Sequence, residues 1–195
     1  MRTVSKISLC VMIALISAGN MASYAQTKNN KEVAKFISTI HSPRNFTDGT
    51  IPDDVIKAIV ESGIKAPSAR NLQPWHFIVV SNSELVNEII PNSNPGNIVI
   101  VVCGQDIPDR AASISLDCGL ATENIFIAAQ AMGLGSRIYT MPIAKINREL
   151  KEKISIPEGF IAVSTIRIGK LTDGADANSG ATPRKNYDEM VTYKK

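Results

Sequence analysis

Two stretches early in the chain carry apolar residues at intervals of three and four positions. These residues are Val33, Phe36, Ile37 and Ile40 in the first stretch, and Ile56, Ile59, Val60 and Ile64 in the second. The spacing places them on one face of an α-helix, which predicts a helix over about 29–40 and another that follows Thr50. Pro52, Asp53 and Asp54 support the second helix, because proline and acidic residues are favoured in a first helical turn.

Three short apolar runs rich in β-branched residues predict strands at 77–80, 98–102 and 161–168. Residues 137–139 predict a further short strand. Ser81 and Glu84 lie at the spacing of a capping box, which predicts a helix directly after the first strand. Helices and strands that alternate in this way favour a doubly wound parallel sheet. No GxGxxG motif follows a strand, so the sequence gives no support to a Rossmann dinucleotide site.

Two further helices and a connector complete the second half of the chain. Residues 112–132 are apolar around much of a helical circumference, which is typical of a helix buried in a core or a dimer interface, and Gly133 marks the predicted end. Residues 143–154 predict a surface helix of mixed charge. The polar stretch 172–182 contains alanines and glycines and predicts an extended connector.

The first 25 residues have the pattern of a secretory signal peptide. Arg2 and Lys6 precede the apolar run 7–16, and Ser23-Tyr24-Ala25 supplies the small residues of a cleavage site after Ala25. A transmembrane helix needs roughly 20 unbroken apolar residues, whereas Ser17 interrupts this run. We therefore expect residues 26–195 to form one domain that is exported to the periplasm or secreted, without a stable membrane anchor.

Charge and cysteine content exclude several classes of function. The whole chain has a net charge of +3, and the part after the predicted signal peptide is close to neutral, which indicates neither nucleic acid nor an anionic membrane as a partner. Only Cys103 and Cys118 follow residue 25, so there is no disulfide framework and no cysteine-based metal site. The two thiols leave a single bridge or two buried free cysteines as alternatives, and the second is favoured.

Residues 41–46 read His-Ser-Pro-Arg-Asn-Phe. They resemble the opening signature R-[RH]-S-x-[RK]-x-[FY] of the nitroreductase family, which implies that His41, Ser42 and Arg44 hold the ribityl chain, phosphate and pyrimidine edge of FMN. A dianionic phosphate requires guanidinium and hydroxyl donors, which Arg44 and Ser42 provide. Ile40 stands where the family usually has a phosphate-binding arginine, so one charge is missing or comes from elsewhere. Taken alone, this segment also fits a solvated loop at a helix end.

A second segment is more specific, because residues 66–77 read APSARNLQPWHF. They closely match the AP[ST]xxNxQPWxF box of the same family. The resemblance implies that Pro67, Ser68, Ala69 and Asn71 contact the polar rim of the flavin through backbone groups and the asparagine amide. Trp75 is expected to pack in the core, and His76 is as compatible with a surface position as with a functional one.

Three later segments extend the resemblance to nearly the whole chain after residue 31. Residues 117–136 resemble a family helix whose role is packing at the dimer interface. The family then has a strand that ends in a glycine pair facing flavin N5; here Tyr139 and Thr140 take that place without the glycines. Residues 183–191 are similar to the terminal PRKPLEEVV tail, which implies that Arg184 and Lys185 close over the flavin phosphate.

Together these segments imply an α+β sandwich in which a mainly antiparallel sheet is flanked by helices, assembled as an intertwined homodimer with one FMN per subunit. The implied activity is ping-pong oxidoreduction with NAD(P)H as donor and nitroaromatics or quinones as acceptors. No side chain is assigned as a nucleophile or general base, because the cofactor carries the chemistry. Export from the cytoplasm makes the donor an open question. An exported flavin-binding protein with little or no turnover is the alternative.

Overall fold

The computed structural model describes residues 31–172 and 183–194. Residues 31–39 form a helix, close to the predicted 29–40, and belong to a unit that ends at Ile40, whereas a second unit begins at His41. The predicted signal peptide and most of the connector predicted at 172–182 lie outside the described residues.

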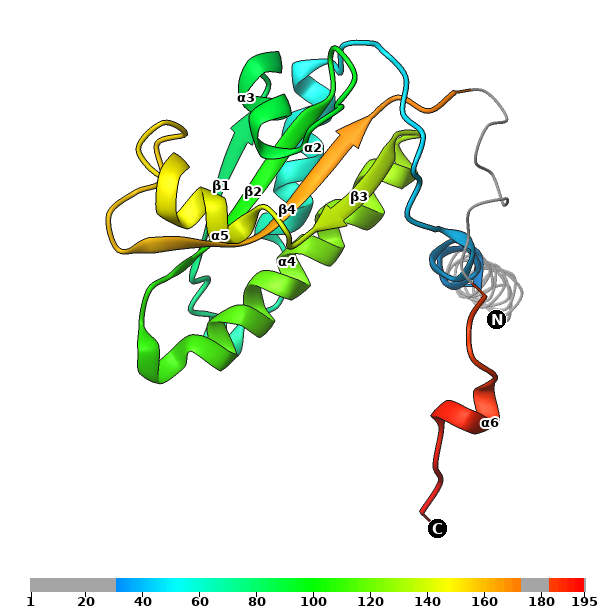
Figure 1. Cartoon of the computed structure of the whole chain (residues 1–195). Coiled ribbons are helices and arrows are strands. Elements are labelled where there is room, and N and C mark those ends of the chain that lie inside the picture. The colour runs from blue at the N-terminus through cyan, green and yellow to red at the C-terminus, as the bar shows by residue number, and fades with distance from the viewer. Residues whose placement is uncertain (1–30, 173–182, 195) are drawn as a thin grey trace, which may run out of the picture. The chain divides into compact units, whose positions relative to one another are not determined.

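The centre of the larger unit is a four-stranded sheet (Figure 1). Its strands are β1 (Trp75–Val80), β2 (Ile98–Gln105), β3 (Gly135–Tyr139) and β4 (Phe160–Gly169). They lie in the order β1-β2-β4-β3, and every neighbouring pair is antiparallel. The parallel sheet that alternation alone favours is therefore wrong, because alternation carries no information on strand direction. The α+β class implied by the family resemblance is confirmed.

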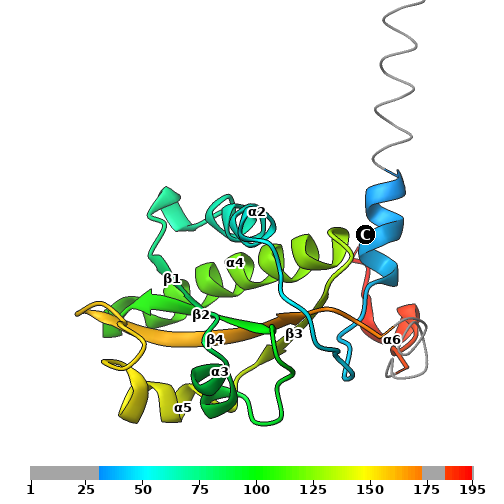
Figure 2. The same ribbon diagram turned by 90° about the horizontal axis from the view of Figure 1, so that it is seen from above.

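Helices cover both faces of the sheet (Figure 2). One face carries α2 (Asp53–Ile64) and α4 (Ala111–Ala131), and the other carries α3 (Ser83–Ile89), α5 (Ile143–Lys145) and the π-helical turn η3 (Ile146–Leu150). Two short 3-10 turns, η1 (Ala69–Asn71) and η2 (Pro108–Arg110), and a C-terminal helix α6 (Tyr187–Met190) complete the described elements.

The central strand β2 supplies core residues to both faces because its side chains alternate in direction. Ile98, Ile100 and Val102 pack under α2 and α4, whereas Val99 and Val101 pack toward α3 and α5. The predicted continuous apolar strand is confirmed. Helices α2 and α4 approach closely at Gly63, where an added Cβ would lie 2.8 Å from Ile125 Cδ1. Burial of these two layers of apolar side chains is the main stabilising contribution to the fold.

One local prediction is wrong, because the side chain that caps α3 belongs to Asn82, whose Oδ1 accepts a hydrogen bond from Leu85 N, and not to Ser81. The surface helix predicted at 143–154 is present as α5 and the π-helical turn η3, with Ile146, Leu150 and Ile154 buried and the charged residues 148, 149, 152 and 153 exposed. Its departure from regular α-helix was not predicted. Here Asn147 exchanges two hydrogen bonds with the backbone of Ala162 in β4, so tertiary contacts fix this turn.

The structure decides between the two alternatives for the cysteines. Cys103 and Cys118 are both buried and free. Cys103 packs in the core layer next to α3 and α5, whereas Cys118 lies in the layer next to α2 and donates its thiol proton to the Cys103 carbonyl at 3.7 Å. Burial raises the pKa of Cys103 to about 12 and that of Cys118 to about 11. They are unreactive packing residues.

Candidate functional site

The first group of predicted site residues lies in the loop 66–74, here called the anchored loop, between α2 and β1. Pro67 and Ala69 are exposed and Ser68 is half-buried. Ser68 Oγ accepts a hydrogen bond from Gln73 N at 3.0 Å, and its carbonyl accepts one from Asn71 N at 3.0 Å. The loop therefore satisfies many of its own polar groups and is held in one shape.

The backbone of the anchored loop is strained. Arg70, Asn71 and Gln73 have φ values of 54°, 56° and 46°, which place three non-glycine residues in the left-handed region. Such residues are uncommon and cost of order 1–3 kcal/mol each unless surrounding structure holds them. Strain of this kind accumulates at ligand sites, and here it leaves Asn71 exposed at the surface of the loop.

Asp117 on α4 fixes the anchored loop through a hydrogen bond to its backbone. Its Oδ1 accepts a hydrogen bond from Ala69 N at 3.0 Å, and the residue is only 2% exposed. Its other oxygen, Oδ2, is buried without a partner in the described residues. The sequence indicated only a packing role for this part of α4. The available signal was an acidic residue on the buried face of an otherwise apolar helix, because buried carboxylates are rarely without a specific function.

The second group lies at the other end of the sheet, here called the basic end: residues 41–46 with Arg137 of β3 and Arg167 of β4. The His41 carbonyl accepts a hydrogen bond from Gln130 Nε2 at 2.8 Å, which fixes the loop to the C-terminal part of α4. Ser42 and Arg44 are exposed. His41 Nε2 is buried and has no hydrogen-bond partner among the described residues. A buried polar atom without a partner costs stability, so this nitrogen is a candidate for a ligand contact.

Two arginines lie side by side behind this loop. Arg137 and Arg167 are directly paired across β3 and β4, so their side chains leave the same face of the sheet. Arg137 Nη1 donates to the Pro43 carbonyl at 3.2 Å, and Arg167 is 6% exposed and donates to the side-chain oxygens of Asn97 and Asn94. None of the three ion pairs in the described residues involves either arginine. Like charges placed opposite each other destabilise a sheet, which indicates that this end of the molecule is shaped for an anion.

Tyr139 and Thr140 lie beside the basic end. The Arg137 guanidinium lies over the Tyr139 ring at 5.5 Å, and the Tyr139 carbonyl accepts a hydrogen bond from Thr165 Oγ1 at 2.9 Å. Thr140 is exposed at the end of β3. Arg137 thus links Tyr139 to the loop 41–46, and the predicted cofactor role of Tyr139 and Thr140 stays a prediction.

A single chain holds the two groups apart. The anchored loop is attached to α4 at Asp117, and the basic end is attached to the same helix at Gln130. At a rise of 1.5 Å per residue, these positions are about 20 Å apart along the helix axis. The predicted cofactor residues of the anchored loop and those of the basic end therefore lie in two separate groups of one subunit, here called half-sites. Arg184 and Lys185 are exposed in the described segment 183–194, and their prediction remains untested.

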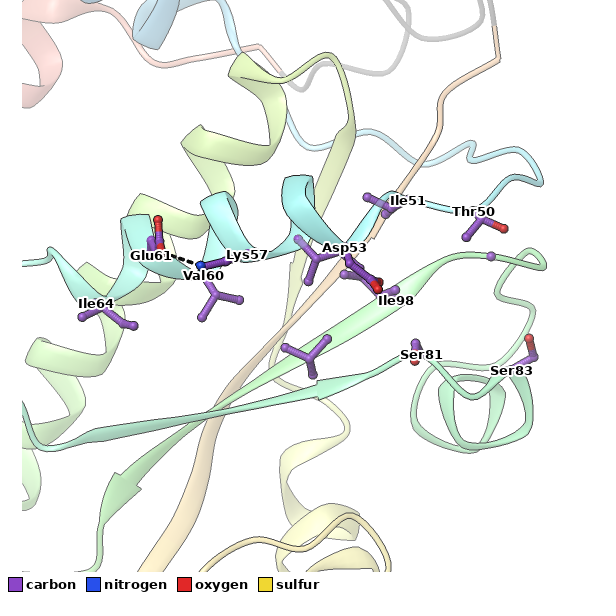
Figure 3. A pocket seen from close by; sticks show the side chains of 13 residues that line it. Thr50, Ile51, Asp53, Lys57, Val60, Glu61, Ile64, Ser81, Ser83 and Ile98 are labelled. Atoms are coloured by element: carbon purple, nitrogen blue, oxygen red, sulfur yellow. Dashed lines mark ion pairs between the residues drawn. The ribbon is translucent and has the colours of Figure 1, made fainter.

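A pocket lies elsewhere, between α2 and strands β1 and β2 (Figure 3). It has a volume of about 820 Å³, and Lys57 and Glu61 form an ion pair of 3.9 Å on its α2 side. None of the predicted cofactor residues lines it. His76 also lies outside it, exposed on β1 with its ring 5.7 Å from that of Phe160. The pocket is thus distinct from both half-sites.

Neither a metal nor a membrane segment emerges from the described ranges. No group of three histidine, cysteine, aspartate or glutamate residues in them is placed to hold a metal ion. The helices described within 31–172 and 183–194 include none that is long and apolar enough to cross a membrane.

The fold defines a class: an α+β protein with an antiparallel sheet covered by helices on both faces. Comparison with known proteins gives the family. The profile of the nitroreductase family matches residues 37–111. A putative NADH dehydrogenase/NAD(P)H nitroreductase of Archaeoglobus fulgidus is 34% identical over 158 residues, which covers 75% of this chain and 89% of the relative. The chain belongs to the nitroreductase family.

Other relatives agree with this assignment. A putative NADH dehydrogenase/NAD(P)H nitroreductase of Methanothermobacter thermautotrophicus is 32% identical, over 71% of this chain and 76% of the relative. Among solved structures, a nitroreductase of Bacteroides fragilis with bound FMN has a TM-score of 0.70 at 20% identity and covers 84% of this chain and 99% of its own. A nitroreductase of Desulfitobacterium hafniense with bound FMN has a TM-score of 0.69 at 24% identity, over 84% and 98%. These structures confirm the fold.

Proposed function

We propose that this protein is an FMN-dependent oxidoreductase that accepts a hydride from NAD(P)H and reduces nitroaromatics, quinones or similar acceptors. The observation that carries the proposal is the basic end, where a loop with the family's flavin signature adjoins two arginines that form no ion pair in the described residues. Family membership and the names of the relatives support the reaction class.

The residues present fit FMN. Its phosphate carries two negative charges, for which Ser42, Arg44 and the neighbouring guanidiniums are suitable donors. The partnerless His41 Nε2 offers a further contact to the cofactor. Pro67, Ser68, Ala69 and Asn71 present backbone and amide groups that match the polar rim of an isoalloxazine. When bound, FMN supplies two-electron hydride chemistry.

The protein's own part in the reaction is binding and orientation. The strained anchored loop has its conformation before the cofactor binds, so little conformational entropy is lost when the isoalloxazine ring binds against it. Positive charge at the basic end favours an anionic cofactor over a neutral one. No side chain is required as a nucleophile or general base. Donor and acceptor would use one pocket in turn, which gives ping-pong kinetics.

We further propose that the active form is a homodimer, because the two half-sites lie about 20 Å apart along α4 in one chain. A two-fold axis can place the anchored loop of one subunit beside the basic end of the other. Helix α4 offers a surface for this contact: Leu116 and Leu120 are 64% and 37% exposed, and the space around Gly119 is open. Apolar side chains exposed on a helix with small neighbours are typical of an interface.

The proposed location is the periplasm or the extracellular space, since residues 1–25 have the pattern of a signal peptide. NAD(P)H is a cytoplasmic metabolite, so at this location NAD(P)H would be the donor of the purified protein in the assay and the physiological donor would be another reductant. Mass spectrometry of the protein purified from its native host tests this proposal. A mature chain that begins at Gln26 supports it, and an intact N-terminus in the cytoplasmic fraction contradicts it.

The decisive experiment is an absorbance spectrum of the protein with added FMN, followed by anaerobic titration with NADPH and NADH. Bleaching of bound flavin and its recovery on addition of a nitroaromatic or quinone would support the proposed enzyme. Bound flavin that neither nicotinamide reduces, and that nitroaromatics do not reoxidise after chemical reduction, would favour the flavin-binding alternative. Absence of flavin binding would contradict both.

A further inference from the structure

The sequence leaves one positive charge unaccounted for. Ile40 stands where an arginine would contact the flavin phosphate, and Ser42 and Arg44 remain as the donors of that segment. A phosphate dianion taken from water needs several charge-assisted hydrogen bonds to replace its hydration. A second guanidinium near Ser42 and Arg44 would meet this need, and it can come from any part of the fold.

Arg137 lies in the position that this requirement describes. Its Nη1 donates to the carbonyl of Pro43, the residue between Ser42 and Arg44, at 3.2 Å. This bond uses one of five N–H donors, so most of the guanidinium fork remains available. The side chain is half-buried and lies over the Tyr139 ring, which holds its orientation. A preordered guanidinium loses little entropy when it binds an anion.

The neighbourhood of Arg137 adds positive charge, and no ion pair of the described residues neutralises it directly. Arg167 is its direct cross-strand neighbour, almost fully buried, with its guanidinium 4.2 Å above the Phe46 ring. Burial lowers the pKa of Arg167, and the charge of Arg137 acts in the same direction, although Tyr139 opposes both. Asp48 accepts a hydrogen bond from the Asn94 amide, whose oxygen accepts one from Arg167. The Asn94 amide therefore lies between the Asp48 carboxylate and Arg167.

Two adjacent guanidiniums lower the stability of a protein unless they bind an anion. Like charges directly opposite each other in an antiparallel pair are destabilising, and a buried arginine is usually paired with an acid. An exposed arginine in the same chain shows the usual solution, since Arg148 pairs with Glu149 at 2.6 Å. Arg167 is bonded to Asn97 and Asn94, whereas Arg137 has only the Pro43 carbonyl and the Tyr139 ring among the described residues, which indicates an anionic ligand as its further partner.

We propose that Arg137 is a phosphate-binding residue of the FMN site, which supplies from strand β3 the charge that Ile40 does not provide. Arg167 acts through Arg137: it raises the local positive potential and supports the loop through Phe46. This inference rests on the proposed function, because it assumes that FMN is the cofactor.

The test compares the binding of FMN and riboflavin, which differ by the phosphate, to the purified protein by quenching of flavin fluorescence. The variants are Arg137→Gln and Arg137→Lys. Arg148→Gln is the matched control, because Arg148 is an arginine that is already paired with an acid. For Arg137→Gln we expect the Kd of FMN to rise about tenfold to a hundredfold, the scale of a lost charged hydrogen bond, while the Kd of riboflavin changes little. Arg137→Lys keeps the charge without the fork and should lose affinity for FMN alone, to a smaller extent. Arg148→Gln should match the unmodified protein.

Thermal unfolding of each variant checks that it is folded; if Arg137→Gln is not, Arg137→Lys decides. Equal weakening of both flavins would show that Arg137 contacts another part of the cofactor and would overturn the inference, as would unchanged binding of both. Failure of the proposed function has a different signature: the unmodified protein would then bind neither flavin, and the phosphate role would fall with it.

Discussion

The two ends of α4 support opposite kinds of surface. At Asp117 the helix holds a loop that hydrogen-bonds to itself, carries Arg70 as its one charged residue and has three residues in strained conformations. At Gln130 it holds a loop beside two arginines, with a buried histidine nitrogen that has no partner in the described residues. The loop at the first position has a fixed conformation without a ligand, whereas the second position has two arginines and a histidine nitrogen that can bind one. Each end has what the other lacks, which supports a site formed by two subunits.

The largest effect is expected from breaking the contact between subunits. Leu120→Asp places a charge on the exposed face of α4, and we expect a monomer with FMN affinity reduced at least a hundredfold, because neither half-site holds the cofactor alone. Light scattering and fluorescence titration measure the two effects. Ile107→Asp is a matched control, since Ile107 and Leu120 are both 37% exposed. A monomeric Leu120→Asp variant that binds FMN normally would contradict a divided site.

The next effect concerns the anchored loop. Asp117→Ala removes the acceptor of Ala69 N, and we expect FMN affinity to fall about tenfold. Global stability should change little, because the removal also eliminates the buried oxygen without a partner. Trypsin should cleave after the exposed Arg70 faster than in the unmodified protein. Glu123→Ala, an exposed acid on the same helix, should leave cleavage unchanged. An unaltered rate in Asp117→Ala would show that Asp117 does not hold the loop.

An added positive charge tests whether the basic end binds the FMN phosphate. Ile40→Arg restores the residue that the family usually has, and we expect it to tighten FMN binding about fivefold without affecting riboflavin. Ile40→Gln is the uncharged control. If tighter binding of both flavins followed, the added side chain would not be acting on the phosphate.

The smallest effect depends on the buried thiols. In the unfolded chain they ionise near their ordinary pKa of 9.0, whereas in the folded protein they remain protonated up to about pH 11 or 12. The unfolded state therefore binds fewer protons above pH 9, and stability should fall between about pH 9 and 11. Chemical denaturation of the unmodified protein and of Cys118→Ala at several pH values measures this. A pH dependence that is identical in the two proteins would contradict the burial of an ionisable thiol.

The sequence predicted well those elements whose apolar spacing is local. Helices α2 and α4 and strand β2 lie within a few residues of their expected positions, because burial on one face leaves a periodic pattern. Strand direction came only from the family resemblance, since periodicity does not report it. In the region 143–154 the helix was predicted but its π-helical turn was not, because Asn147 bonds to β4, a contact that no local pattern encodes.

The candidate site was predictable to the same extent: local sequence signatures could be recognised, and contacts between distant residues could not. The two signature segments could be recognised in the sequence, but their separation in one subunit could not, because it depends on which end of α4 each segment contacts. Arg137 escaped notice for a related reason. Its significance comes from Arg167, its neighbour across the sheet, and from Pro43, and both are distant in the sequence.

The most direct test of a divided site is complementation between two defective proteins. One carries Ser42→Ala and Arg44→Gln at the basic end, and the other carries Asn71→Gly and Asp117→Ala at the anchored loop, where glycine tolerates the positive φ of residue 71. Each protein alone should bind FMN poorly. After the two are mixed, unfolded and refolded together, each mixed dimer should contain one intact site, so that roughly a quarter of all sites recover FMN binding. No recovery in mixed dimers that have been shown to form would contradict the account, because it would place both half-sites of each cofactor on the same chain.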